Sequence, residues 1–252
     1  MSITIAVAGK GGTGKTSITS LIIRYLLQKG KCPILAVDAD PNANLGDSLG
    51  LKISQTIGSI IVTFNEEKIN IPPGMTKEAY LEFKLNDALL ESQGLDLLTM
   101  GRGEGPECYC YPNLMLRKFM DSLMGNYPYT VMDNEAGMEH LSRRTTQNVD
   151  ELLFVSDHSM KGIRTIARLK ELVRELKLVV RRESVIINQV PGEIDPLVRE
   201  EMGRLGLEVA AAVPLDAQIK EFDLNFQPLV TLPDTSVAVQ AVNGLMDRLA
   251  IK

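Results

Sequence analysis

Short apolar runs alternate with amphipathic stretches along most of this chain. The first run, residues 3–8, is continuous and rich in β-branched side chains, which is typical of a strand buried on both faces. After a glycine-rich turn, apolar positions recur with helical spacing over 16–29, and the same spacing is clearest over 160–177. Further strands are predicted at residues 33–37, 95–100, 129–133, 152–156, 184–188 and 209–213.

Strands that alternate with helices indicate parallel strand pairing, with helices on both faces of the sheet. We therefore expect an α/β fold, a doubly wound and mostly parallel sheet that forms a single domain over residues 1–252. Residues 54–93 show no clear periodicity and are expected to form an irregular insertion of loop and helix. No apolar run approaches the roughly 18–20 residues that span a bilayer.

The composition is that of an ordinary globular protein, with 44% hydrophobic and 23% charged residues. A net charge of -5 argues against a dedicated nucleic-acid-binding protein, which normally has a basic face. The N-terminus lacks the basic segment of a secretory signal, and the chain has 3 cysteines. These features favour a reducing cytoplasm, where cysteine chemistry means metal binding or redox chemistry.

The turn after the first strand carries the residues of a phosphate-binding site. Residues 9–16 read GKGGTGKT and match G-x-x-x-x-G-K-[ST] between a strand and a helix. Glycines let backbone N–H groups point at phosphate oxygens, and the helix adds its positive N-terminus. We expect Lys15 to neutralise the β- and γ-phosphates and the Thr16 hydroxyl to ligate Mg²⁺. The expected nucleotide contacts in this loop are Gly9, Gly11, Gly12, Thr13, Gly14, Lys15, Thr16 and Ser17.

A second lysine, Lys10, precedes Lys15 in the loop. This form of the loop resembles the deviant phosphate loop of the nitrogenase iron protein, the cell-division and partitioning ATPases, and the arsenite-pump ATPase. In that family the additional lysine reaches across a homodimer to the partner's nucleotide. The resemblance therefore implies an ATP-dependent homodimer in which Lys10 acts in the catalytic site of the other copy.

Carboxylates at two strand ends complete the expected catalytic site. The segment AVDADPNANL places Asp38 and Asp40 at the C-terminal end of a strand, where ligands gather in open α/β sheets. Asp40-Pro41 resembles the family's first switch, which implies that Asp40 orients the attacking water and touches the Mg²⁺ shell. The segment VMDNEAG resembles the second switch, which implies an outer-shell Mg²⁺ carboxylate at Asp133 and a glycine, Gly137, close to the γ-phosphate.

The base of the nucleotide is expected near two later segments. In INQVPG, Asn188 resembles the asparagine that reads adenine in this family. A guanine-reading site would have a lysine next and an aspartate two residues beyond it, whereas Gln189 and Pro191 occupy these positions, so ATP is favoured over GTP. The segment VPLDAQI resembles the loop that lines the adenine pocket. That resemblance assigns Val213, Pro214, Leu215 and Asp216 to the pocket.

Two of the cysteines form a Cys-x-Cys pair, Cys108 and Cys110, beyond the C-terminal end of a predicted strand and hence on the nucleotide side. If this stretch is extended, both sulfurs lie on one face. Two thiolates are half of a tetrahedral Zn²⁺ or square-planar Ni²⁺ site, and the two-fold axis of the dimer implied by Lys10 would supply the other half. Cys32 lies at the opposite end of the sheet and is expected to pack as a small hydrophobe.

The Cys-Tyr-Cys segment, together with DNEAGMEHLSRRT over 133–145, resembles the nickel-insertion ATPases of the carbon monoxide dehydrogenase and acetyl-CoA synthase systems. In these accessory proteins the Cys-x-Cys of two subunits holds one metal ion. The resemblance implies a cytoplasmic, Mg²⁺-dependent ATPase and metallochaperone that binds nickel or zinc. Its partners would be a second copy and a client enzyme, either the dehydrogenase or the synthase, with no nucleic acid and no membrane.

Two other interpretations stay open. A positioning or partitioning ATPase shares the nucleotide site but needs a membrane-binding terminal helix or a basic DNA-binding face, and the last predicted helix, 236–251, is typical of a packed helix. A redox ATPase similar to the nitrogenase iron protein needs two cysteines on separate segments, and no cysteine follows Asp133. His140 and His158 are isolated histidines and are given no metal role.

Overall fold

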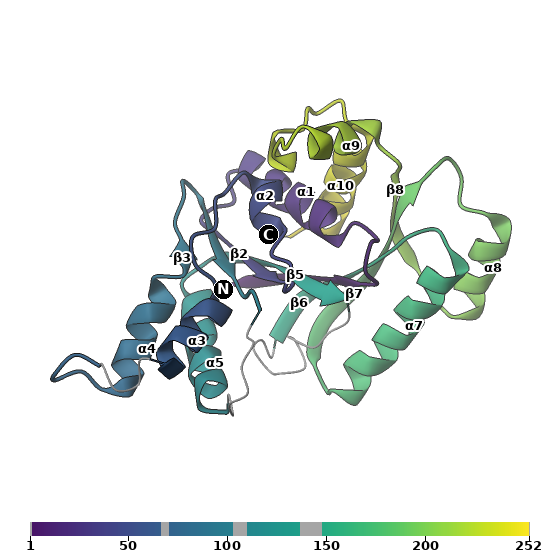
Figure 1. Ribbon diagram of the computed structural model, residues 1–252. Helices are drawn as coiled ribbons and strands as arrows, with labels where there is room; N and C mark the ends of the chain where they lie inside the picture. The colour runs from purple at the N-terminus through teal and green to yellow at the C-terminus, as the bar shows by residue number, and fades with distance from the viewer. Residues whose placement is uncertain (1, 67–70, 103–109, 137–147, 252) are drawn as a thin grey trace.

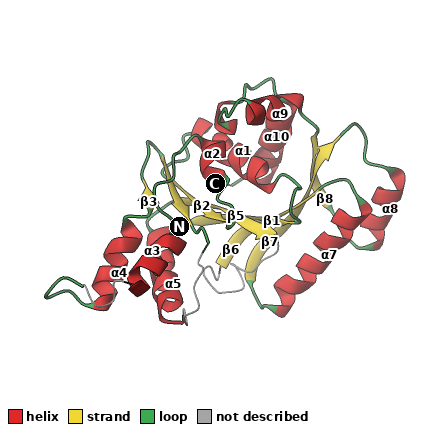
Figure 2. Cartoon of the chain, viewed as in Figure 1, coloured by secondary structure: helices red, strands yellow, loops and turns green. Residues whose placement is uncertain are grey.

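The computed structural model describes residues 2–66, 71–102, 110–136 and 148–251. Over these residues the chain forms an eight-stranded sheet in the order β3-β4-β2-β5-β1-β6-β7-β8. All neighbouring strands pair parallel except β3 and β4, which pair antiparallel. Helices cover both faces of the sheet (Figures 1 and 2). The predicted doubly wound, mostly parallel α/β fold is therefore confirmed.

The strands form where apolar and β-branched side chains follow one another, because the sheet is buried on both faces. Each of the strands predicted from the sequence is present, several of them longer than predicted. The strands are β1 (Ile3–Gly9), β2 (Ile34–Ala39), β3 (Leu89–Leu90), β4 (Leu95–Thr99), β5 (Tyr129–Ala136), β6 (Asn148–Ser156), β7 (Val179–Val190) and β8 (Val209–Pro214).

Several helices begin at a polar side chain that accepts a hydrogen bond from a backbone N–H of the first turn. Thr76, Ser159, Asp195 and Ser236 cap helices in this way. None of the helices in the described ranges is both long and apolar enough to cross a membrane. The helices are α1 (Lys15–Gln28), α2 (Leu45–Leu49), α3 (Ile57–Glu66), α4 (Lys77–Asn86), α5 (Cys110–Gly125), α7 (Met160–Glu175), α8 (Pro196–Arg204), α9 (Ala217–Leu224) and α10 (Val237–Leu249), with a short 3-10 helix η1 (Leu229–Thr231).

The sheet separates two hydrophobic clusters. Alternate residues of β1 point to opposite faces, so Ala6 and Ala8 belong to one cluster while Ile5 and Val7 belong to the other. Helices α3, α4, α5, α7 and α8 supply the first cluster, and α1, α2, α10 and η1 supply the second. The central strands therefore have no polar face, which is why their sequences are continuous apolar runs.

The segment 54–93 is more regular than its sequence predicts. It contains α3 and α4, which pack on the same face of the sheet as α5, and the edge strand β3. In α4 only Tyr80, Leu81 and Leu85 are buried, too few to give a clear helical repeat in the sequence. The helices join the outer layer beside β3, so this segment extends the sheet at its antiparallel edge.

Candidate nucleotide-binding site

The phosphate loop lies between the end of β1 and the start of α1, in the middle of the sheet. A Cβ atom at Gly9 would lie 2.1 Å from the carbonyl oxygen of Val155 in β6, so only glycine allows this close approach. Gly14 adopts φ 83, a left-handed conformation that also favours glycine. Buried Thr13 donates hydrogen bonds from its hydroxyl to the carbonyls of Lys10 (2.8 Å) and Val155 (3.2 Å). The loop is thereby fixed to the neighbouring strand β6.

Lys15 begins α1, and its ammonium group bonds back to the loop. Its Nζ donates to the carbonyl of Lys10 over 3.3 Å. Burial lowers the pKa of Lys15, while the carboxylates of Asp133, Asp40 and Glu135 act in the opposite direction. The N-cap of α1 is Gly14, which has no side chain to cap the first N–H groups of the helix. Uncapped N–H groups beside a lysine form a site suited to phosphate.

Asp133, at the carboxyl end of β5, is hydrogen-bonded to the first turns of α1. The hydroxyl of Thr16 donates to its Oδ2 over 2.6 Å, and that of Thr19 donates to its Oδ1 over 3.3 Å. Asp133 is 1% exposed, and burial raises its pKa to about 6 despite the Thr16 bond and the Lys15 charge. A hydroxyl and a carboxylate are oxygen ligands that Mg²⁺ prefers, and a cation would relieve the buried negative charge. The side chains present therefore fit a magnesium ion with its nucleotide.

Asp38 and Asp40 lie at the end of β2, next to β5. Asp38 is in register with Asp133 and has 0% exposure. Burial raises the pKa of Asp38 to about 7, with Asp133 adding to the effect and the backbone N–H groups of Leu45 and Asp40 opposing it. Asp40 is partly exposed, and its Oδ1 accepts bonds from the backbone N–H and the side-chain amide of Asn42, each at 2.9 Å. Two predicted acidic residues, Asp40 and Asp133, are thus brought to the same edge of the sheet as the phosphate loop.

Asn188 contacts the phosphate loop directly. Its Nδ2 donates to the carbonyl of Thr13 over 2.9 Å, and the side chain is buried. A Cβ atom at Gly14 would lie 2.4 Å from this nitrogen. The sequence assigned Asn188 to adenine only, and its role as a support of the loop was missed because Thr13 lies far away in the sequence. The adenine contact stays a prediction, with Oδ1 and the other N–H as the groups available for it.

The Asp216 carboxylate accepts hydrogen bonds from the first turns of two helices, α9 and α10. Its Oδ1 accepts a bond from the backbone N–H of Gln218 in α9 (2.9 Å). Its Oδ2 accepts bonds from the Ser236 hydroxyl (2.6 Å) and from the Ala238 N–H of α10 (3.1 Å). Burial acts to raise the pKa of Asp216, but these hydrogen bonds outweigh it and the pKa is lowered. Any adenine contact by this segment is therefore expected from its backbone and from exposed Leu215, not from the Asp216 carboxylate.

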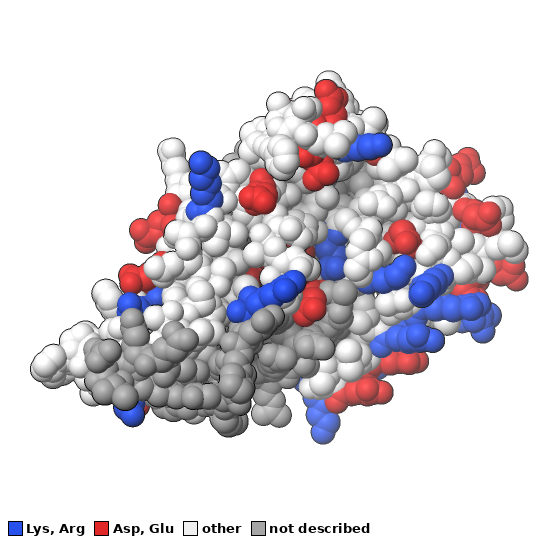
Figure 3. Space-filling view, viewed as in Figure 1, with Lys and Arg blue, Asp and Glu red and all other residues white. Residues whose placement is uncertain are grey.

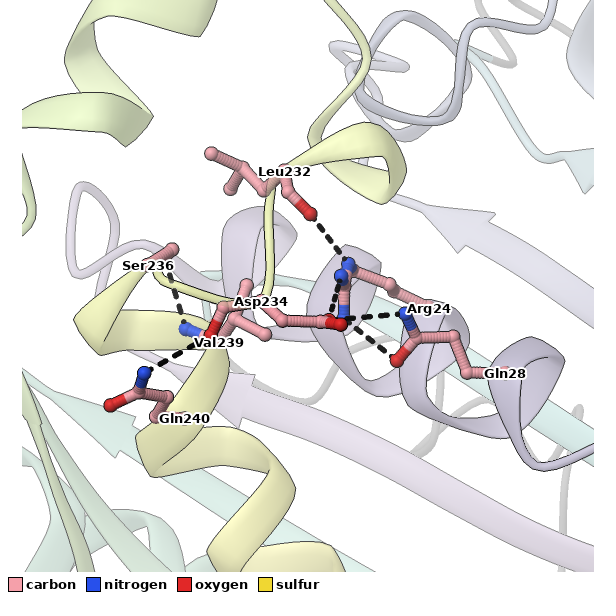
Figure 4. Close-up of polar contacts among 7 residues, drawn as sticks. All are labelled: Arg24, Gln28, Leu232, Asp234, Ser236, Val239 and Gln240. Carbon is pink, nitrogen blue, oxygen red and sulfur yellow. Dashed lines mark hydrogen bonds and ion pairs between the residues drawn. The ribbon is translucent and has the colours of Figure 1, made fainter.

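Helix α1, which carries Lys15 and Thr16, is joined through its own residue Arg24 to the segment that precedes α10 (Figure 4). The Arg24 side chain is buried and donates to the carbonyl of Leu232 (3.0 Å), to Gln28 (2.9 Å) and to Asp234 (2.6 Å). Figure 4 shows this guanidinium between α1 and the segment that leads into α10. A single arginine thus joins the phosphate-loop helix to the C-terminal part of the chain.

The cysteine predictions have mixed outcomes. Cys110 is the first residue of α5, so the extended conformation is wrong for Cys110 and Tyr111. Proline is accepted in the first turn of a helix, which explains why Pro112 does not prevent α5 from starting here. Cys32 is exposed, so its predicted packing role is wrong as well.

Several predicted residues lie outside the described part of the chain: Cys108, Gly137 and His140. His158 is described and exposed. Within the described ranges no group of three or more His, Cys, Asp or Glu side chains could hold a metal ion. The Cys-x-Cys metal site therefore stays a prediction.

The sequence model of the CobQ/CobB/MinD/ParA nucleotide binding domain family matches residues 4–229 of this chain. The chain is 41% identical over 250 residues, 98% of each chain, to an uncharacterized ATP-binding protein of Methanocaldococcus jannaschii. It is 27% identical over 233 residues (87% of this chain and 86% of the relative) to the carbon monoxide dehydrogenase accessory protein CooC of Rhodospirillum rubrum. In fold it is similar to septum site-determining protein MinD of Pyrococcus horikoshii, solved with Mg-ADP (TM-score 0.71, 20% identity, 99% and 96% of the chains). The chain therefore belongs to the CobQ/CobB/MinD/ParA family, as a P-loop ATPase.

Proposed function

We propose that this ATPase is a cytoplasmic metallochaperone that binds nickel or zinc and drives nickel insertion into carbon monoxide dehydrogenase or acetyl-CoA synthase. The observation that carries the proposal is the Cys108-Tyr109-Cys110 sequence, whose last residue begins α5, in a chain similar to a carbon monoxide dehydrogenase accessory protein. The metal would be held by Cys108 and Cys110 from each of two copies, because one copy supplies only half of a four-coordinate site.

Each residue of the nucleotide site has a defined task in this proposal. Lys15 neutralises the phosphates, and Asp40 orients the water that attacks the γ-phosphate. Lys10 acts in the site of the other copy. Thr16 and Asp133 would hold Mg²⁺, partly through water, with Asp40 at the edge of its shell, and the bound cation would supply positive charge beside the phosphates.

The order of elements suggests how the nucleotide site could be coupled to the cysteines. Strand β4 leads toward the Cys-x-Cys segment and pairs with β2, which ends beside Asp40. On its other side the segment continues through α5 into β5, which carries Asp133. Asp40 therefore follows a strand, β2, that pairs with the strand before the cysteines, β4. Asp133 lies on β5, the strand that follows α5 in the chain. A change at the γ-phosphate would change the separation of the two Cys-x-Cys pairs, and by linkage the metal would change nucleotide affinity equally.

The charge distribution favours a protein client over nucleic acid. On the face drawn in Figure 3, a small group of basic side chains lies over α7 with acidic side chains around it, and the net charge is -5. A partitioning ATPase that binds DNA without sequence preference needs a continuous basic surface. We therefore rank a positioning ATPase below the metallochaperone, as an outcome that the metal experiment can support.

The proposal is tested by metal titration and gel filtration. Purified protein would be titrated with Ni²⁺ and Zn²⁺, beside the variants Cys108→Ser and Cys110→Ser and the matched control Cys32→Ser. We expect one metal per two chains in the wild type and in Cys32→Ser, with metal-dependent dimerisation. Both Cys-x-Cys variants should lose metal binding and metal-dependent dimerisation. Undiminished metal binding in both would contradict the carrier role. No metal binding with intact ATPase activity would favour a positioning ATPase, and an iron–sulfur absorption band after anaerobic purification would favour a redox ATPase.

A further inference from the structure

Asp38 is fully buried beside Asp133 and Asp40 and has no part in the phosphate or magnesium contacts proposed for them. Its Oδ1 accepts a hydrogen bond from the backbone N–H of Asp40 (3.1 Å), and its Oδ2 accepts one from the backbone N–H of Leu45 (2.9 Å). Asp40 begins the segment that follows β2, and Leu45 is the first residue of α2. One carboxylate thus binds both ends of the loop 40–44.

The start of α2 depends on this contact. The N-cap of α2 is Asn44, whose side chain makes no capping hydrogen bond. The first N–H groups of a helix lack partners within the helix and need an acceptor from elsewhere. For Leu45, whose side chain and amide are buried, that acceptor is Asp38. The carboxylate on β2 therefore does for α2 what a capping residue does in other helices.

The loop between these two bonds is itself folded around Asp40. The Asp40 carboxylate accepts the two bonds from Asn42, and the Asp40 carbonyl accepts one from the N–H of Ala43 (3.0 Å). The backbone carbonyl of Asp38 is in turn fixed to the end of β4 by the N–H of Met100 (2.8 Å). Asp38 is therefore a fixed point on the sheet, and the loop that carries Asp40 is attached to it twice.

We infer that Asp38 is a positioning residue for ATP hydrolysis, which holds Asp40 at the γ-phosphate by binding both ends of its loop. A shift of either end would leave an oxygen of a buried carboxylate without a partner, so the loop favours this one arrangement. Asp38 does not itself touch the substrate in this assignment. The inference rests on the proposed role of Asp40.

The test measures kcat and KM for ATP, and the dissociation constant of a non-hydrolysable ATP analogue, in variants of the full chain. Asp38→Ala should lower kcat on the order of 100-fold, the cost of a misplaced catalytic group, with KM and analogue binding near those of the wild type. Asp38→Asn keeps one acceptor oxygen on a side chain of nearly the same shape, so its kcat should fall between those of the wild type and Asp38→Ala. If Asp38→Ala does not fold, the Asn variant alone carries the test.

Asp96→Asn is the matched control, since Asp96 lies near the opposite end of β4 and also accepts two internal bonds, from the Ser92 N–H (2.9 Å) and the Tyr127 hydroxyl (2.5 Å). It should lower the melting temperature and leave kcat unchanged. Wild-type kcat in folded Asp38→Ala or Asp38→Asn would overturn the inference, as would a rise in KM at unchanged kcat. Asp40→Ala, measured beside them, separates the two claims. A wild-type kcat in Asp40→Ala would reject the proposed role of Asp40, and with it the inference about Asp38. A low kcat in Asp40→Ala together with a wild-type kcat in Asp38→Ala would reject only the inference about Asp38.

Discussion

The hydroxyl of Thr16 donates a hydrogen bond to Asp133 over 2.6 Å and so joins the first turn of α1 to the end of β5. The phosphate loop and the proposed second switch are therefore in direct contact. Because the same two oxygens would hold Mg²⁺, the metal would act on both elements at once.

Thr16→Ala should weaken the response to Mg²⁺ while Thr16→Ser retains it, since only the hydroxyl is needed as a ligand. We expect the Mg²⁺ concentration for half-maximal ATPase activity to rise on the order of 10-fold in the alanine variant, about 1.4 kcal/mol of lost binding. Thr19→Ala is the matched control, because its hydroxyl bonds to the Lys15 carbonyl as well as to Asp133 and lies further from the latter. Equal Mg²⁺ requirements for both alanine variants would argue against Thr16 as a ligand.

The nucleotide-free protein should lose stability as the pH rises from about 4 toward 7. Burial raises the pKa of Asp38 to about 7 and that of Asp133 to about 6, so the folded state holds protons that the unfolded state has released. That contribution is complete below the unfolded pKa of an aspartate, about 4, and is lost as the pH passes the folded values. Melting temperatures of the wild type and of Asp38→Asn across this range check it. The variant should show a smaller decline, and equal slopes for the two proteins would contradict the prediction.

Substitution of glycines in the phosphate loop should cost very different amounts of stability. A Cβ at Gly9 would meet the backbone of Val155 at 2.1 Å, and a backbone oxygen cannot move aside easily. A Cβ at Gly12 would meet no atom within 4 Å, so Gly12→Ala should cost only the left-handed backbone strain, about 1–2 kcal/mol. We therefore expect Gly9→Ala to be much less stable than Gly12→Ala in denaturant unfolding without nucleotide. Similar midpoints for the two would show that the loop relaxes freely.

Arg24→Ala should destabilise the chain more than Asp234→Ala. The arginine is buried and serves three acceptors, and two of them, the Leu232 carbonyl and Gln28, remain bonded to it when Asp234 is replaced. We expect about 2–3 kcal/mol for Arg24→Ala from hydrogen bonds of a charged group, and a smaller loss for Asp234→Ala. Urea unfolding with matched m-values checks the difference, and an equal loss in both variants would contradict this view of the network.

Asp216→Ala should cost more than the loss of a single helix cap. Its carboxylate serves the first turns of both α9 and α10, whereas Asp195 caps only α8. At about 1 kcal/mol per cap, we expect about 2 kcal/mol for Asp216→Ala and about 1 kcal/mol for Asp195→Ala in denaturant unfolding. Because the folded pKa of Asp216 is lowered, its contribution is present above pH 4, the approximate unfolded value, and is lost on acidification. A smaller loss for Asp216→Ala than for Asp195→Ala would reject the double cap.

The main elements of the site could be predicted from the sequence, because the patterns that indicate them are local. The apolar runs of β1 and β5 and the GKGGTGKT turn each lie within a few residues, so the sheet, the phosphate loop and Asp133 were predictable. The tasks of Asp216 and Asn188 were not, because their bonding partners, Ala238 and Thr13, are distant in sequence. A helix was expected within 54–93, but the bounds of α4 were not predictable because few of its positions are buried. The start of α5 at Cys110 was not predicted because the alternation of Cys and Tyr suggests a strand.

The central claim is that ATP controls how tightly two copies of the chain hold a metal through Cys108 and Cys110. The most direct test is the Ni²⁺ dissociation constant of the dimer, measured by competition with a chelator in the presence of a non-hydrolysable ATP analogue and again with ADP. Our account predicts a difference of about 5–150-fold between the two nucleotide states, the usual range for coupled sites, and the same ratio in nucleotide affinity with and without Ni²⁺. It also predicts that the difference disappears in Cys110→Ser. Equal Ni²⁺ affinity in both nucleotide states, in protein that binds the metal through these cysteines, would contradict it.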